Sequence, residues 1–162
     1  SLTSGHTAEN SNAYNTLTMN NIVDQKVDIY SGTAVTASLA DASGSADSLT
    51  VNLATRAADK GFAKSVGTVT ANNIETINMD ASGMSNGQAT TIAALTGNAI
   101  GTLNITGDSD VTFTAFTSST KLANIDASAS TGDISLAAAP VAATLPSTIK
   151  TGGGNDLSLI HI

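Results

Sequence analysis

Aspartate is the side chain in this sequence best suited to chemistry. Of the 13 acidic residues eleven are Asp, and most of them lie at turns or strand ends. Short carboxylates beside free backbone carbonyls supply the oxygen ligands that a hard cation such as calcium requires. The alternative for each Asp is that it closes a turn and hydrates the surface. The residues we expect to bind calcium are Gly152, Gly154, Asn155 and Asp156, followed by Asp126, Asp80 and Asp41.

The glycine-rich stretch 151–156, Thr-Gly-Gly-Gly-Asn-Asp, is the sharpest of these features. It resembles the start of the nonapeptide G-G-x-G-x-D-x-U-x of calcium-binding β-rolls, with Gly154 on the third glycine and Asp156 on the Asp. Glycine permits a tight turn that exposes carbonyls, and Asp supplies the charge. Sites of this kind hold the ion between two consecutive turns, and we expect the turn that would complete this single copy to lie beyond residues 157–162.

Catalysis is the competing chemistry. Asp108 and Asp110 could serve as acid and base of a carbohydrate-active β-helix enzyme, a lyase or hydrolase. Arg56 is the only Arg, however, Trp and Cys are absent, and no basic residue lies near these two Asp in sequence. His6 lies in a polar stretch without a G-x-S-x-G elbow. We therefore expect no enzyme.

Repeated segments must position these side chains. Segments 74–80, 100–106 and 122–128 share the pattern apolar-x-x-apolar-(Asn/Asp)-apolar, and shorter strands at 111–114 and 134–136 lie between them. The unit is about 24 residues with two short strands, which cannot bury an apolar face unless units stack. The sequence therefore predicts an all-β, parallel β-solenoid (a β-helix or β-roll), with a β-sandwich as the alternative.

Apolar and polar residues alternate within each strand, which predicts the inward face. Asn78, Asn104 and Asp126 should stack in one column. Segments 53–64 and 87–95 are candidates for short helices. The expected inward residues are Leu49, Val51, Leu53, Ile77, Met79, Leu103, Ile105, Val111, Phe113, Ile125, Ile134 and Leu136.

The expected organisation has three parts. Residues 1–33 fit the repeat poorly and are expected to form irregular N-terminal rungs or a linker, and 34–156 form the solenoid. Residues 157–162, Leu-Ser-Leu-Ile-His-Ile, match one reading frame of a transposase adapter used in sequencing libraries. We expect a cloning scar there, the alternative being one more apolar strand. The chain starts with Ser rather than Met, so we interpret it as an internal piece of a longer protein.

The charge and hydropathy of the sequence exclude some classes of binding partner. The net charge of −7 with only six basic residues argues against nucleic acid. No apolar run approaches the roughly 20 residues that span a bilayer, so we expect no membrane insertion. Thr68-Val69-Thr70 and Thr112-Phe113-Thr114 are T-x-T strands, as in ice-binding solenoids, but ice binding requires such pairs in register on successive rungs. The sequence shows a broken array.

Four segments carry a family resemblance: 41–53, 73–82, 102–108 and 124–132. They resemble the repeat region of Gram-negative S-layer proteins and related surface proteins with calcium-binding nonapeptide repeats. The resemblance covers roughly 34–156. It implies a calcium-dependent structural protein, adhesin-like or part of an S-layer, exported by a type I system to the bacterial cell surface. Its partners would be further copies, neighbouring domains of the same protein, or cell-surface polysaccharide.

Overall fold

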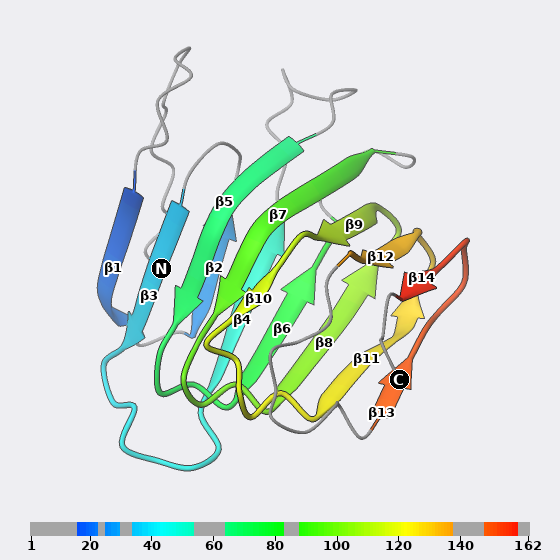
Figure 1. Ribbon diagram of the computed structural model, residues 1–162. Helices are drawn as coiled ribbons and strands as arrows, with labels where there is room; N and C mark the ends of the chain where they lie inside the picture. The colour runs from blue at the N-terminus through cyan, green and yellow to red at the C-terminus, as the bar shows by residue number, and fades with distance from the viewer. Residues whose placement is uncertain are drawn as a thin grey trace.

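The computed structural model describes residues 16–22, 25–29, 34–53, 64–82, 88–137 and 148–158. Within these ranges the chain forms strands and turns and no helix (Figure 1). The chain passes back and forth between two sheets, so that each rung gives one strand or one pair of short strands to each sheet. No helix in the described ranges is long and apolar enough to cross a membrane.

Every strand pairing in the two sheets is parallel, which confirms the predicted parallel β-solenoid; a β-sandwich would need antiparallel pairs. In Figure 1 the first sheet, sheet A, lies in front of the second, sheet B. Sheet A contains β1 (Thr16–Ile22), β3 (Ala34–Leu39), β5 (Lys64–Ala71), β7 (Ala89–Thr96), β9 (Asp110–Phe113), β10 (Phe116–Thr117), β12 (Ile134–Leu136) and β14 (Leu157–Ser158). Sheet B contains β2 (Lys26–Ile29), β4 (Ser48–Leu53), β6 (Thr76–Asp80), β8 (Thr102–Gly107), β11 (Asn124–Ser130) and β13 (Thr148–Lys150).

The core lies between the two sheets and is built as the alternation predicts. All twelve predicted inward residues are at most 3% exposed. Leu49, Ile77, Leu103 and Ile125 occupy one register position on four successive rungs of sheet B. The largest side chains of the core, Phe113 and Phe116, stack with ring centroids 5.3 Å apart. Aliphatic residues of modest size fill the rest of the interior, which explains the scarcity of aromatics.

Rung length varies, while register within the sheets is kept. Ser48 pairs with Thr76, 28 residues later, whereas Thr102 pairs with Asn124, 22 residues later. The extra residues lie in the connections, so the strands still place side chains in columns, meaning one register position on successive rungs. β1 and β2 precede residue 34 and pair within the same two sheets.

The helix expected at 87–95 is wrong. Residues 89–96 form β7, which pairs with β5 on one side and with β9 and β10 on the other. Thr90, Thr91 and Ile92 are β-branched residues, which favour strands, and Ile92 and Leu95 are fully buried. The other helical candidate, 53–64, falls almost entirely on residues outside the described ranges.

Candidate functional site

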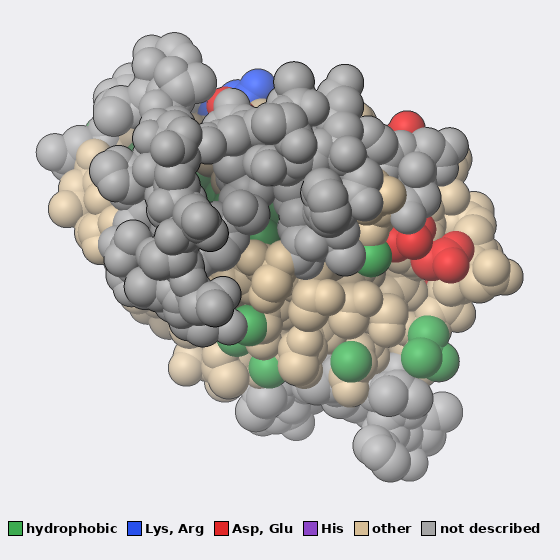
Figure 2. Space-filling model, turned by 90° about the horizontal axis from the view of Figure 1, so that it is seen from above, with side chains coloured by type: hydrophobic (Ala, Val, Ile, Leu, Met, Phe, Trp, Pro, Cys, Tyr) green, Lys and Arg blue, Asp and Glu red, His purple; other side chains and the backbone are tan. Residues whose placement is uncertain are grey.

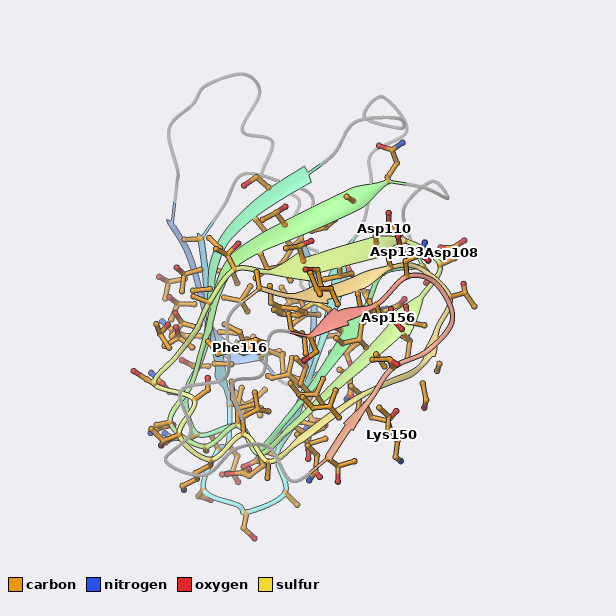
Figure 3. The ribbon with its side chains drawn as sticks, turned by 45° about the vertical axis from the view of Figure 1, so that its right-hand side comes forward. Asp108, Asp110, Phe116, Asp133, Lys150 and Asp156 are labelled. Carbon is orange, nitrogen blue, oxygen red and sulfur yellow. The ribbon has the colours of Figure 1, made fainter. Side chains whose placement is uncertain are left out.

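Four acidic residues gather where the chain crosses from sheet B to sheet A. Three such crossings are described: 108–109 after β8, 131–133 after β11 and 151–156 after β13. Figure 3 shows Asp108, Asp110, Asp133 and Asp156 close together at this edge. We call Asp110, Asp133 and Asp156 the acidic corner.

Glycines let successive crossings lie directly on one another. A Cβ at Gly152 would lie 2.1 Å from the carbonyl oxygen of Ser130. Gly154 has a φ of +100°, and a Cβ there would lie 2.7 Å from Oδ1 of Asp133. Only glycine tolerates this conformation and this approach at low cost. The glycine-rich stretch therefore packs on the preceding turn, as a site between two consecutive turns requires.

The carboxylates of the acidic corner accept backbone N–H groups from adjacent rungs. The amide of Asp133 donates to Oδ1 of Asp110 at 2.8 Å, and the amide of Asn155 donates to Oδ1 of Asp133 at 2.6 Å. The amide of Ile134 donates to Oδ1 of Asp156 at 3.0 Å. Hydrogen bonds to a charged acceptor are stronger than neutral ones, and an unpaired amide at a partly buried corner would be costly. Each carboxylate thus joins two rungs.

Three of the predicted calcium ligands lie elsewhere and share a local turn. Asp41, Asp80 and Asp126 each precede Ala-Ser. In each case Oδ1 accepts both the amide and the hydroxyl of the Ser two residues later, at distances from 2.5 to 3.1 Å. Asp41 follows β3 in sheet A, while Asp80 and Asp126 occupy different columns of sheet B. The seven predicted residues therefore do not form one centre.

Asp126 also carries an ion pair. Its Oδ2 lies 3.1 Å from Nζ of Lys150, the residue above it in the same column. The Ser128 hydroxyl, the Ser128 amide and then Lys150 lower the pKa of Asp126 from its ordinary 3.8 to about 2. The Ser43 hydroxyl and amide likewise lower the pKa of Asp41. Both carboxylates are therefore ionised at neutral pH.

The predicted polar column on sheet B is confirmed. Asn78, Asn104 and Asp126 share one register position, and Nδ2 of Asn104 donates to Oδ1 of Asn78 at 2.8 Å. Sequence reasoning missed two similar contacts, Asn52 to Asp28 at 2.5 Å and Asn98 to Asn73 at 3.0 Å. Their separations of 24 and 25 residues match the repeat length, which is the signal that could have found them.

A further carboxylate pair was also missed. The amide of Asp47 donates to Oε2 of Glu75 at 2.9 Å, and Asp47 accepts the amides of Glu75 and Thr76 at its own carbonyl. Oδ2 of Asp47 is buried without a hydrogen-bond partner. The 28-residue separation exceeds the average repeat, which is why alignment of the repeats did not reveal this contact.

The ligands at the acidic corner fit calcium in part. Two carboxylates, Asp133 and Asp156, project from adjacent turns, and the carbonyl of Gly132 lies beside Gly154. Calcium takes six to eight oxygens. Over the described part of the chain, no group of three or more His, Cys, Asp or Glu is placed to hold a metal ion. Carbonyls and water would have to supply most of the ligands.

The described residues that a carbohydrate-active enzyme would use do not lie together in one place. Asp110 is bonded to the amide of Asp133, and Lys150 lies on β13, away from the acidic corner in Figure 3. Its described partner is Asp126. Arg56, His6 and His161 lie outside the described residues.

No protein-family model, curated protein or solved structure matches the chain. The assignment of the fold therefore rests on the strand pairing of this chain itself.

Proposed function

We propose that this chain is a structural segment of a secreted bacterial cell-surface protein, of the S-layer or adhesin-like kind, without catalytic activity of its own. The observation that carries the proposal is the use made of the carboxylates. At the acidic corner and in the Asp-Ala-Ser turns, their Oδ1 atoms are occupied by backbone amides and serine hydroxyls. Side chains used in this way hold rungs and turns together.

Calcium stabilisation at the acidic corner is part of the proposal. The stretch 151–156 lies directly on the turn at 131–133, with Gly154 against Gly132 and Asp133. Stacked Asp residues repel one another, and the net charge of −7 adds to that repulsion. A divalent cation on the oxygens of Asp133 and Asp156 would offset it. Binding to the folded state only would add about 2.7 kcal/mol at a hundredfold excess over the dissociation constant.

Location and partners follow from the same proposal. A stack of parallel rungs propagates along one axis and suits a protein that spaces or tiles a surface. The resemblance of 34–156 to S-layer repeats favours the bacterial cell surface, with further copies or neighbouring domains as partners. Cell-surface polysaccharide is a second class of partner.

Thermal unfolding in calcium and in chelator tests the calcium part of the proposal. We expect the chain to melt at a higher temperature in calcium, and Asp156→Asn to lose most of that increase. Asp41→Asn is the matched control, because Asp41 lies after β3 and its Oδ1 serves only a local turn. Equal melting temperatures in calcium and chelator, with no calcium retained after dialysis, would show these Asp to be turn residues only.

A carbohydrate-active enzyme is the alternative that must be tested separately. Incubation of the chain with acidic polysaccharides should give no new reducing ends or unsaturated products. Turnover that is lost in Asp108→Asn would overturn the structural proposal.

A further inference from the structure

The outward side of sheet A carries a column of threonines. Thr18 pairs with Thr36, Thr36 with Thr70, Thr70 with Thr96, and Thr96 with Thr117. These five residues, the threonine column, occupy one register position on β1, β3, β5, β7 and β10. None is buried, and they alternate in sequence with inward residues such as Val35, Val69 and Leu95.

Parallel strands space this column regularly. Neighbouring strands lie about 4.8 Å apart, so five hydroxyls and five methyl groups repeat at that interval along the stack. Threonine is β-branched and stiff at χ1, which limits how far each hydroxyl can move. The hydroxyls of Thr96 and Thr117 lie 2.5 Å apart, which ties two members of the column together.

Further small and hydroxyl-bearing side chains flank the threonine column on the same side of sheet A. Thr68 lies two residues before Thr70 on β5, and Ala94 takes the same position on β7. Towards the other end of the strands, Ser65, Thr91, Thr112 and Ser135 form another hydroxyl column. The T-x-T pairs at 68–70 and 112–114 do not align with each other, as the sequence suggested, but the columns do not depend on those pairs.

Charge is nearly absent from this face. Among the described side chains that point outward from sheet A, Asp110 at the acidic corner is the charged one. Figure 2, which views the edge of the stack that is uppermost in Figure 1, shows most of its acidic side chains gathered at the right. A repeating face without charge suits an uncharged, repeating ligand. Polyanions and charged protein surfaces are poor matches.

We propose that this face, centred on the threonine column, binds ice. Oxygen positions in hexagonal ice repeat at an interval close to the spacing of parallel strands. Rigid threonines at that interval can hydrogen-bond and order water into the lattice, while their methyl groups and the neighbouring Ala94 fill the gaps between water molecules. A crystalline polysaccharide is a weaker match, because sugar rings favour aromatic platforms and the described outward side chains of sheet A include no aromatic. This activity does not depend on the structural role proposed above.

Ice growth in supercooled solution is the test, with the 162-residue chain and two matched variants. Thr70→Lys places a charge in the middle of the threonine column. Thr76→Lys is the control, since Thr76 is a half-buried threonine on the outward side of sheet B. Circular dichroism and thermal melting establish that both variants fold as the parent does.

The expected result is faceted ice crystals and a freezing point below the melting point for the parent and for Thr76→Lys. Thr70→Lys should lose both effects. If Thr70→Lys does not fold, Thr70→Ser, which removes only the methyl group, should reduce the freezing gap without abolishing it. Unshaped crystals from the parent, or equal behaviour of the two Lys variants, would overturn the proposal. So would a parent dimer in sedimentation that Thr70→Lys dissociates, because a second copy would then cover the face.

Discussion

The outward sides of the two sheets cover one core and differ in the polar side chains that they carry. Sheet B presents Asn, Asp and Lys beside Ser and Thr, and its amide and charged side chains bond from rung to rung, as Asn78 does with Asn104 and Asp126 with Lys150. Sheet A presents mainly Thr, Ser and Ala, and among its described outward side chains Thr96 and Thr117 hydrogen-bond to each other. Outward residues are thus free to diverge once inward residues have fixed the stack. On sheet B they stabilise it, and on sheet A they are available to solvent.

Core truncation should affect both sheets equally, and it has the largest expected effect. Ile77 in sheet B and Ile92 in sheet A are both fully buried. Ile77→Ala and Ile92→Ala should each lower the free energy of unfolding by about 2–5 kcal/mol, because each leaves a cavity. Denaturant unfolding measures this. A large loss for one variant and none for the other would show that the sheets do not share a single core.

Replacing a glycine at a crossing should have the second-largest effect on stability. Gly107 has a φ of +113°, and a Cβ there would lie 2.5 Å from the carbonyl carbon of Ala81. Gly107→Ala should cost more than about 1 kcal/mol, since an L side chain is strained in that conformation. Gly153→Ala is the control, because the nearest atom to its Cβ lies 3.8 Å away. Chemical denaturation of the two variants should separate them clearly, and similar losses would refute the close packing of the crossings.

The polar column on sheet B should contribute more than the hydroxyls on sheet A. Asn104→Ala removes a half-buried hydrogen bond to Asn78 and should cost about 0.5–1.5 kcal/mol. Thr68→Ala should change stability by less than about 0.5 kcal/mol, since Ala94 already occupies the same position on the next rung. A cost for Thr68→Ala that matches Asn104→Ala would remove the distinction between the two faces.

The smallest expected effect is a loss of stability in acid through Asp126 on sheet B. Its pKa is lowered to about 2 in the folded chain, so the folded state favours the ionised form. The contribution is present at pH values above 3.8 and is lost as the pH falls towards 2. Denaturation midpoints of Asp126→Asn should therefore fall less over that pH range than those of the parent. Parallel pH profiles would contradict the stabilising role of the Ser128 and Lys150 contacts.

The fold could be predicted because its signal is local. Alternation with a period of two identifies inward residues such as Leu49 and Val51 within one strand, and repeats at 74–80, 100–106 and 122–128 align without gaps. The same alignment places Asn78 beside Asn104. Nothing in these steps requires knowledge of how the chain crosses between sheets.

The threonine column and the acidic corner could not be predicted, because both depend on connections of unequal length. Successive members of the threonine column are 18, 34, 26 and 21 residues apart, so no fixed period reveals them. The crossings at 131–133 and 151–156 differ in length by three residues. Which amide meets Asp133 or Asp156 is therefore decided by packing of glycines such as Gly154 rather than by spacing.

Hydrogen exchange of three backbone amides tests the central claim that carboxylates of the acidic corner join adjacent rungs. The amides of Asp133, Ile134 and Asn155 donate to Asp110, Asp156 and Asp133, respectively. They should exchange slowly in the parent chain, and Asp156→Ala should accelerate exchange at Ile134 while leaving Asp133 protected. Exchange at all three amides as fast as at an exposed loop residue such as Gly44 would contradict the claim.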